Sequence, residues 1–564
     1  MEAKALQVNN SPNPRSADLA QVLNWWDRAD RPQVRAVLIM MLVLLYAASY
    51  APHWQISPDS ALYLSMGRSL AEGEGLNLPP QGSIRVLSGF PILLALIYRI
   101  AGENFPLMNA VMMLTSGLFI IGCYFTFRNF TGSSSALLIT FLVGASHLTM
   151  RYSGRLLADL PFAATTMLTL LLLSQLWHPC VPRRWPLWAV GVLASIAASM
   201  LLRPTGIGVL AGALTILWLG PGQFSRRQRF TVSLIWLLPI SLVTLSTVLL
   251  LDAGSSEGYF QRFILHLSPK TLVLRWAYFT AFQLPATLGE AIHNFTMREV
   301  LDYLAVIYLL LGMATLWKGR QRTLVLFTLI QLGGICVLAP NRRYVIYFLP
   351  LLLYFALVGL LQLYVPLLSK ISSRIKAEIL VPVIWIVIFL SAATVRNLQL
   401  VKLAQSNDYY ATLKDGRYKD YHTLAGWLRQ QQHDSVLTFV PEPIVLGYLA
   451  RKPVDSPFPG RSPADPAKEL FRKLSGAHTC YVFATDEEPE IKEAILQLLQ
   501  DGKIIAEPQE EPRLIWGELW LVHPQPAENV HAHGRTRCQP VSPAIARRSR
   551  TPASELDRPA LAQK

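Results

Sequence analysis

The sequence has few cysteines and few charged residues for its length, and both shortages narrow the class of protein. Five cysteines are spread over 564 residues, and none lies near another at the spacing of a metal-binding motif. This pattern argues against a zinc cluster and against a disulfide framework. Charged residues make up 15% of the chain and hydrophobic residues 52%, a balance that is wrong for a soluble protein. No internal repeat of the solenoid type is present.

A cleavable signal peptide is not expected either. The first 35 residues are polar, and no small-residue cleavage pattern follows the first apolar run. We therefore expect residues 1–35 to be a cytoplasmic segment and the first apolar run to remain as an anchor. At the other end, residues 524–564 are rich in Ala, Pro, Arg and Ser without an apolar period, which predicts a disordered tail.

Long apolar stretches dominate the region between residues 36 and 395. Each is close to the ~20 residues that a helix needs to cross the hydrocarbon layer. The sequence therefore predicts an α-helical integral membrane protein with about 11 transmembrane helices. The expected spans are 36–52, 107–127, 134–150, 159–177, 186–202, 204–220, 230–251, 300–317, 323–339, 344–364 and 378–395.

Lys and Arg residues are concentrated in alternate short loops between these stretches. The net charge of +15 therefore need not indicate nucleic acid, because basic residues in short loops hold a membrane topology in place. The positive-inside rule assigns these loops to the cytoplasm and, with an odd number of spans, the carboxyl-terminal segment to the outside. We expect a multi-pass protein of the inner (plasma) membrane in contact with membrane lipids.

Three long segments are expected on the outside, and the two loops among them are too long to be simple connectors. The loops 53–106 and 252–299 are two of them, and residues 59–70 in the first loop have the period of an amphipathic surface helix. The third, residues 396–523, has mixed polar composition and predicts a small extracytoplasmic α/β domain. Its expected elements are helices at 418–432 and 488–499 and strands at 435–440, 479–484 and 514–522.

Two carboxylates lie at span edges on the outside, where a charge is costly unless it lines a site or finds a partner. Asp59 follows Ser57-Pro58 at the start of the surface helix, and Asp159 precedes Pro161 at the start of the fourth span. Both positions also suit a helix cap, which is the alternative interpretation. Two such groups on one face can have different roles. One can remove a proton from an acceptor hydroxyl while the other orients that hydroxyl or a metal.

Three arginines lie on the same side of the membrane. Arg203 is followed by Pro204 and Gly206 in a short turn, and Arg342 and Arg343 precede the tenth span. A guanidinium group recognises phosphate through two N–H donors, so converging arginines suit a phosphate or pyrophosphate ligand. The alternative is that they reach lipid headgroups as interfacial anchors.

Several short motifs, taken in order, resemble bacterial GT-C glycosyltransferases. The resemblance covers roughly residues 36–395 and is strongest to the group of dolichyl-phosphate-mannose protein mannosyltransferases and the lipid A aminoarabinose transferase. Phe90 departs from the His, Lys or second Pro that many relatives have there. The motifs are Pro58-Asp59-Ser60-x-x-Tyr63, Gly73-x-Gly75-Leu76, Gly89-Phe90-Pro91, Ser153 to Phe162, Leu202-Arg203-Pro204-Thr205-Gly206, Arg343-Tyr344 and Leu349-Pro350.

The resemblance implies GT-C architecture and an inverting sugar transfer from a polyprenyl-phosphate donor to an acceptor hydroxyl on a lipid, glycan or protein. It marks Asp59 as the general base, with Asp159 as the second catalytic carboxylate. No cofactor is required, although a divalent metal would be compatible. Positive residues would hold the lipid phosphate and tyrosines would orient the substrate. The phosphate candidates are Arg203, Arg343, Arg342, Arg85 and Arg155, and the orienting candidates are Tyr63 and Tyr344.

Two other functions remain open at this stage. A lipid or sugar transporter usually has internal repeats and charges near the membrane midplane, whereas here the charges lie at the outer edges. An envelope-assembly protein would use the outside domain for docking and would be indifferent to the loss of Asp59.

Overall fold

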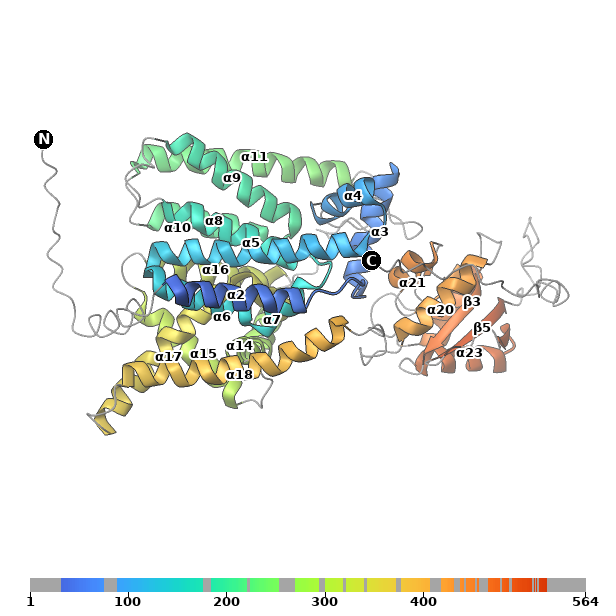
Figure 1. Ribbon diagram of the computed structural model, residues 1–564. Coiled ribbons are helices and arrows are strands. Elements are labelled where there is room, and N and C mark those ends of the chain that lie inside the picture. The colour runs from blue at the N-terminus through green and yellow to red at the C-terminus, as the bar shows by residue number, and fades with distance from the viewer. Residues whose placement is uncertain are drawn as a thin grey trace, which may run out of the picture. The chain divides into compact units, whose positions relative to one another are not determined.

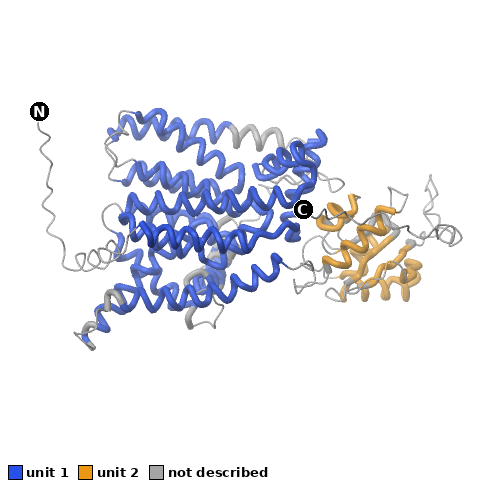
Figure 2. The backbone as a smooth tube through the Cα atoms, viewed as in Figure 1, with its two compact units in different colours: residues 1–415 blue, residues 416–564 orange. Residues whose placement is uncertain are grey.

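The computed structural model divides into two compact units, Met1–Asp415 (unit 1) and Gly416–Lys564 (unit 2) (Figure 2). Most of the expected cytoplasmic segment, residues 1–31, and residues 525–564 of the expected tail lie outside the described residues. The described residues are 32–75, 89–175, 184–220, 224–252, 269–293, 300–317, 321–338, 342–371, 377–405, 417–430, 437–440, 443–451, 454–455, 465–476, 479–485, 489–509, 512, 514 and 517–524.

Unit 1 is built from helices, many of which run side by side as rods (Figure 1). Each of the eleven expected spans coincides with a helix or with a pair of consecutive helices. The helices of unit 1 are α2 Pro32–Ala48, α3 Pro58–Glu72, α4 Gly89–Ala101, α5 Phe105–Thr131, α6 Ser133–Ala145, α7 His147–Ser153, α8 Asp159–Ser174, α9 Trp185–Leu202, α10 Gly206–Leu219, α11 Arg226–Asp252, α13 Pro269–Tyr278, the π-helix η3 Phe279–Gln283, α14 Leu284–His293, α15 Val300–Thr315, α16 Arg322–Leu338, the 3₁₀ helix η5 Arg342–Phe348, α17 Leu349–Ile371 and α18 Ala377–Gln405.

Some of the apolar helices are long enough to cross a membrane unaided, and others are shorter. Within the described ranges, four pass by length and composition: Phe105–Thr131, Trp185–Leu202, Arg343–Leu368 and Leu380–Gln405. The pair α6 and α7, bent by 57°, would make a fifth. Others, such as α2 with 17 residues and α8 with 16, fall short of the ~20 residues of a full span.

Helices α15 and α17 approach closely because each carries a glycine at their contact. A Cβ atom on Gly312 of α15 would lie 1.8 Å from the carbonyl oxygen of Phe355, and one on Gly359 of α17 would lie 1.8 Å from that of Tyr308. Small residues at a helix contact let the backbones approach, which is a common device in membrane bundles. The contact holds α17 in place, and η5 leads directly into α17.

Unit 2 contains a five-stranded mixed sheet with strand order β2-β1-β3-β5-β4. Strand β1 pairs in parallel with β2 and β3, while β5 pairs antiparallel with β3 and β4. Leu470 and Leu474 of α22 and Ile495 of α23 are buried with Val482 and Val522 of the sheet. The elements are α20 Arg417–Gln430, β1 Leu437–Phe439, α21 Pro443–Ala450, β2 Val454–Asp455, α22 Pro466–Gly476, β3 Thr479–Thr485, α23 Pro489–Gln500, β4 Ile504–Gln509 and β5 Gly517–Pro524.

The expected helices and strands of this region correspond to α20, β1, β3, α23 and β5. Two short or irregular strands, β2 and β4, and the helices α21 and α22 were not expected. Strand β4 has the burial pattern of an edge strand, with only Ile504 buried, so its sequence lacks clear alternation. The expected boundary after residue 395 falls inside α18, which continues to Gln405, and the two units divide between residues 415 and 416.

The α15–α17 contact leads to the first prediction. Gly312→Ala places a methyl group against a backbone oxygen that cannot rotate away, so we expect a loss of about 1–3 kcal/mol of stability, the usual cost of overpacking. Gly117→Ala on α5 is the matched control, because nothing lies within 4 Å of its Cβ position and alanine favours a helix by about 0.5–1 kcal/mol. Thermal unfolding in detergent measures both. Equal melting temperatures for the two variants would contradict the close approach.

Candidate active site

The first carboxylate, Asp59, lies in the first turn of α3. The helix is capped by Ser57, whose hydroxyl accepts a hydrogen bond from the Ser60 N–H at 3.2 Å, while the Ser60 hydroxyl accepts one from the Ser57 N–H at 3.0 Å. This reciprocal arrangement is a capping box. Ser57 rather than Asp59 is therefore the N-cap residue, and Asp59 is the acidic residue of the first turn.

The start of α3 is held in place by contacts to α5. The Trp54 indole N–H donates to the Ser60 hydroxyl at 2.9 Å, and the indole stacks on Phe105 with ring centroids 5.8 Å apart. The Asn109 side-chain amide donates to the carbonyl oxygens of Ala51 and His53, both at 2.8 Å. These contacts fix the chain on the amino-terminal side of Asp59.

The second carboxylate forms a buried ion pair that links three elements. Asp159 begins α8, and its Oδ2 atom lies 2.6 Å from Nη2 of Arg203. Its Oδ1 atom accepts a hydrogen bond from the Tyr347 hydroxyl at 3.0 Å. The side chain of Asp159 is 0% exposed and that of Arg203 is 7% exposed. A buried charge needs such pairing, since desolvation of a single charge is costly.

The turn between α9 and α10 presents Arg203 to this carboxylate. Arg203 follows Leu202, the last residue of α9, and takes an extended backbone conformation. A Cβ atom on Gly206 would lie 2.6 Å from the Cα atom of Met200, so only glycine permits the tight return. Because Arg203 is buried here, the lipid-headgroup interpretation does not fit it.

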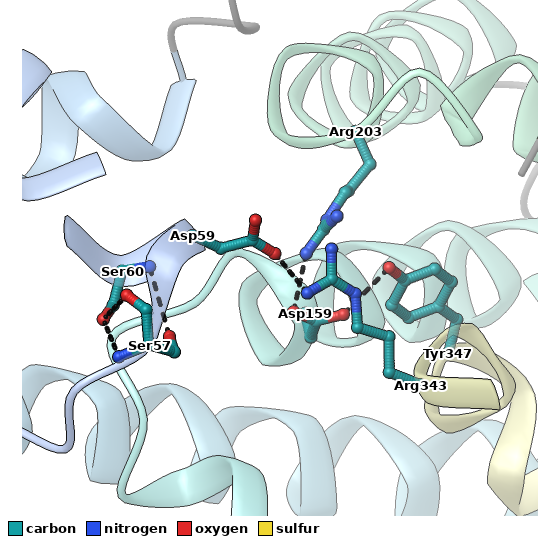
Figure 3. A network of polar contacts seen from close by, with 7 residues as sticks. All are labelled: Ser57, Asp59, Ser60, Asp159, Arg203, Arg343 and Tyr347. Atoms are coloured by element: carbon teal, nitrogen blue, oxygen red, sulfur yellow. Dashed lines mark hydrogen bonds and ion pairs between the residues drawn. The ribbon is translucent and has the colours of Figure 1, made fainter. Parts of the chain in front are cut away.

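A second ion pair lies beside the first and is more open. Arg343 in η5 pairs through Nη1 with the Oδ2 atom of Asp59. The side chain of Arg343 is 23% exposed and that of Asp59 is 37% exposed. Figure 3 shows the four charged side chains converging, with Asp159 and Arg203 in one pair and Asp59 and Arg343 in the other. The four formal charges cancel.

The 3₁₀ helix η5 places aromatic rings beside both guanidinium groups. Side chains three residues apart eclipse one another in a 3₁₀ helix, and the rings of Tyr344 and Tyr347 stack with centroids 5.5 Å apart. The Cζ atoms of Arg203 and Arg343 each lie 5.3 Å from the centroid of the Tyr344 ring. This distance is typical of cation–π attraction, so Tyr344 couples the two arginines.

Tyr63 lies on the inner face of α3, where it is 5% exposed and packs edge-on against Phe90 with ring centroids 5.2 Å apart. Burial raises the pKa of the Tyr63 phenol to about 12, and all four charged residues act on it electrostatically. The phenol is therefore protonated at neutral pH and can donate a hydrogen bond. Its burial does not fit an interfacial aromatic anchor.

The structure brings together six of the residues that the sequence marked as candidates. For the other three, a role at the site stays a prediction. Arg85 lies outside the described residues, and Arg342 belongs to η5 but its side chain is likewise undescribed. Arg155 lies in the turn before α8, where its N–H donates to the Tyr152 carbonyl at 3.2 Å. The six residues are Asp59, Tyr63, Asp159, Arg203, Arg343 and Tyr344.

Tyr347 was not among the candidates, although the spacing of Tyr344 and Tyr347 could have indicated it. Two tyrosines three residues apart share a face of a helix. An apolar run starts at the same point, so Tyr347 resembles a hydrophobic residue of the predicted span rather than a polar residue of the site. Among the described residues, no group of three or more His, Cys, Asp or Glu side chains could hold a metal ion.

Part of the chain matches a known family. Residues 89–250 match the family model described as dolichyl-phosphate-mannose-protein mannosyltransferase. This region runs from α4 to α11 and contains Asp159 and Arg203, while Asp59 and Arg343 lie outside it. No curated protein matches the chain.

Solved structures of membrane glycosyltransferases share its fold. The structure of ArnT from Cupriavidus metallidurans bound to undecaprenyl phosphate matches with a TM-score of 0.53 and 13% identity, over 86% of this chain and 97% of that chain. The Archaeoglobus fulgidus oligosaccharyltransferase tethered with an acceptor peptide matches with a TM-score of 0.52 and 12% identity, over 86% of this chain and 74% of that chain. At these identities the likeness establishes the GT-C fold.

The two ion pairs should differ in their contribution to stability. Asp159→Asn leaves Arg203 buried without its counter-charge, and breaking such a pair costs about 3–5 kcal/mol. Asp59→Asn removes one partner of a more exposed pair, which we expect to change stability by about 0–1 kcal/mol. Thermal unfolding of the two detergent-purified variants measures the difference. A larger effect for Asp59→Asn would contradict the assignment of inner and outer pairs.

Proposed function

We propose that this chain, which belongs with the GT-C membrane glycosyltransferases of the protein mannosyltransferase and ArnT group, transfers a sugar from a polyprenyl-phosphate donor to an acceptor hydroxyl with inversion. The observation that carries the proposal is the pairing of Asp59 with Arg343 beside the buried pair of Asp159 with Arg203. Related folds support the donor class. ArnT from C. metallidurans was solved with undecaprenyl phosphate, and AglB from A. fulgidus with dolichol-phosphate.

Asp59 is the general base in this mechanism. It is the more exposed of the two carboxylates, so an acceptor hydroxyl can reach it. The hydroxyl oxygen attacks the anomeric carbon from the side opposite the phosphate, its proton passes to Asp59, and the bond between sugar and phosphate breaks. Inversion follows from this single displacement. The acceptor is a lipid, a glycan or a protein.

Asp159 acts as a positioning residue. Both of its oxygens are engaged, one by Arg203 and the other by Tyr347, and its side chain is 0% exposed. Such a carboxylate is poorly placed to take a proton from an acceptor. Its function is to hold the guanidinium group of Arg203 in one orientation, which is the preorganisation that charge stabilisation requires.

Arg203 and Arg343 stabilise the phosphate as it leaves. The electron pair of the broken bond goes to a phosphate oxygen, and the two guanidinium groups beside Tyr344 supply positive charge where negative charge develops. Tyr63 and Tyr344 orient the substrate. The two arginines provide the charge that a metal would supply elsewhere, so we propose no required cofactor. A structure of the A. fulgidus oligosaccharyltransferase does contain Zn and sulfate.

Transferase chemistry is better supported than the two alternatives. A transporter is expected to carry its charges near the membrane midplane between inverted repeats. Here the charged side chains come from helix starts and turns, namely the starts of α3 and α8, the turn after α9, and η5. An envelope-assembly protein would be indifferent to the loss of Asp59, so substitution of this residue separates it from a transferase.

Substitution of Asp59 tests the function directly. Asp59→Asn keeps the size of the side chain but cannot accept the proton, so transfer should fall by the roughly 10²–10⁴-fold expected for loss of a general base. The assay is release of polyprenyl phosphate from polyprenyl-phosphate sugars in membranes that contain the variant. Glu72→Gln, at the exposed end of the same helix, is the control and should transfer normally. Undiminished transfer by Asp59→Asn would remove this residue from the mechanism.

The proposal also requires the base and unit 2 to face the outside of the inner membrane, with the amino terminus in the cytoplasm. The basic loops near residues 183 and 226 support this orientation through the positive-inside rule. Reporter fusions after residue 523 and within residues 60–85 should report the outside, and fusions at residues 183 and 226 the cytoplasm. A cytoplasmic signal from the fusion after residue 523 would reverse the orientation and place the reaction on the wrong face.

A further inference from the structure

The two ion pairs of the site differ in how easily a ligand can enter them. Asp159 uses both carboxylate oxygens, binding Arg203 and Tyr347, and is fully buried. Asp59 uses Oδ2 to bind Arg343, and its side chain is 37% exposed. An anion that approaches from the aqueous side therefore meets the outer pair first.

In the proposed mechanism Arg343 exchanges one anionic partner for another, while the buried Asp159 carboxylate also attracts its guanidinium group. In this structure the guanidinium group binds the Asp59 carboxylate, and during transfer it must bind the donor phosphate. If both anions remained on one guanidinium group, two negative charges would lie within a few ångströms of each other, which is unfavourable in a partly desolvated site. Binding of the phosphate therefore favours release of the carboxylate.

We propose that the donor phosphate replaces the Asp59 carboxylate on Arg343, and that this exchange is what activates the base. The inference rests on the proposed function and adds a means of regulation to the same site. Without donor, the carboxylate is neutralised by the arginine. With donor bound, it is released next to the anomeric carbon, where an acceptor hydroxyl can give up its proton.

Arg343 is the partner that stays in place during the exchange. Its guanidinium group lies 5.3 Å from the Tyr344 ring centroid, which also attracts Arg203, and Tyr344 is stacked on Tyr347. The Asp59 carboxylate projects from the first turn of α3, and the cap of this helix is supplied by Ser57 rather than by Asp59. A change of side-chain rotamer is enough to move the carboxylate without unwinding the helix.

The exchange is balanced in charge and in protons. The donor is a phosphodiester with one negative charge, which replaces one carboxylate charge on Arg343. In the transfer step the acceptor O–C bond forms, the C–O bond to phosphate breaks, and the acceptor proton moves to Asp59. The leaving phosphate gains one negative charge while Asp59 loses one. After the product leaves, Asp59 gives its proton to water and pairs with Arg343 again.

Competition between Asp59 and the phosphate for Arg343 has a measurable effect on phosphate binding. A general base that does not compete with the phosphate would not have this effect. If Asp59 must be displaced, Asp59→Asn should bind the carrier phosphate more tightly, although its transfer activity is strongly reduced. We expect a roughly three- to tenfold lower Kd for undecaprenyl phosphate, which corresponds to the loss of a partly exposed ion pair. The measurement is binding of undecaprenyl phosphate to full-length protein in detergent.

A double-mutant cycle separates competition from general electrostatics. Removing any nearby negative charge could tighten binding of an anion, but that effect does not require Arg343. The exchange predicts that Asp59→Asn tightens binding in the wild-type background and has no effect in Arg343→Gln. Glu72→Gln, far along the same helix, should leave Kd unchanged. If Arg343→Gln does not fold, Arg343→Met supplies a neutral side chain of similar length.

Three results would overturn the exchange. One is an unchanged or weaker affinity in Asp59→Asn, which means that the carboxylate does not compete. Another is equal tightening with and without Arg343, which means that the effect is long-range. The third is wild-type protein that binds no undecaprenyl phosphate at all, which removes the exchange together with the carrier-lipid part of the proposed function. The first two leave the proposed function intact, so the failures can be told apart.

Discussion

The buried pair of Asp159 and Arg203 is the interaction on which the rest of the site depends. It joins the start of α8 to the turn after α9 and, through the Tyr347 hydroxyl, to η5. Neither charge could remain at this depth alone, since an unpaired buried ion is strongly unfavourable. The three elements must therefore assemble together, and their assembly fixes the position of the Tyr344 ring that both arginines share.

The outer pair, Asp59 and Arg343, is also an ion pair between aspartate and arginine, but its side chains are more exposed than those of the inner pair. Asp59 and Arg343 are partly exposed to solvent, and the helix is capped by Ser57 rather than by the Asp59 carboxylate. A rigid inner pair beside an exchangeable outer pair lets one site combine stability with turnover. The fixed charges stay preorganised, and only the group that has to react needs to move.

The sequence predicted the helices well because apolar runs and basic loops are local signals. All eleven expected spans coincide with helices, and the surface helix at residues 59–70 corresponds to α3. It predicted lengths less well. Helix α10, Gly206–Leu219, is three residues shorter than the expected span 204–220, because the hydropathy window included turn residues before and after the helix. The end of α18 was missed for the opposite reason, since polar residues enter the sequence at 396–405 while the helix continues.

By itself the sequence determined the class of protein, the order of its helices and most of the charged residues of the candidate site, because helices, span edges and turn motifs are encoded within a few consecutive residues. It could not determine which charges pair. Asp159 meets Arg203 across 44 residues, and Asp59 meets Arg343 across 284, and only tertiary packing sets such contacts. Tyr347 was hidden in an apolar run until the 3₁₀ turn placed its hydroxyl on Asp159. The packing also decided which carboxylate is buried and held and which is exposed, and the division of roles between the two carboxylates follows from that difference in solvation.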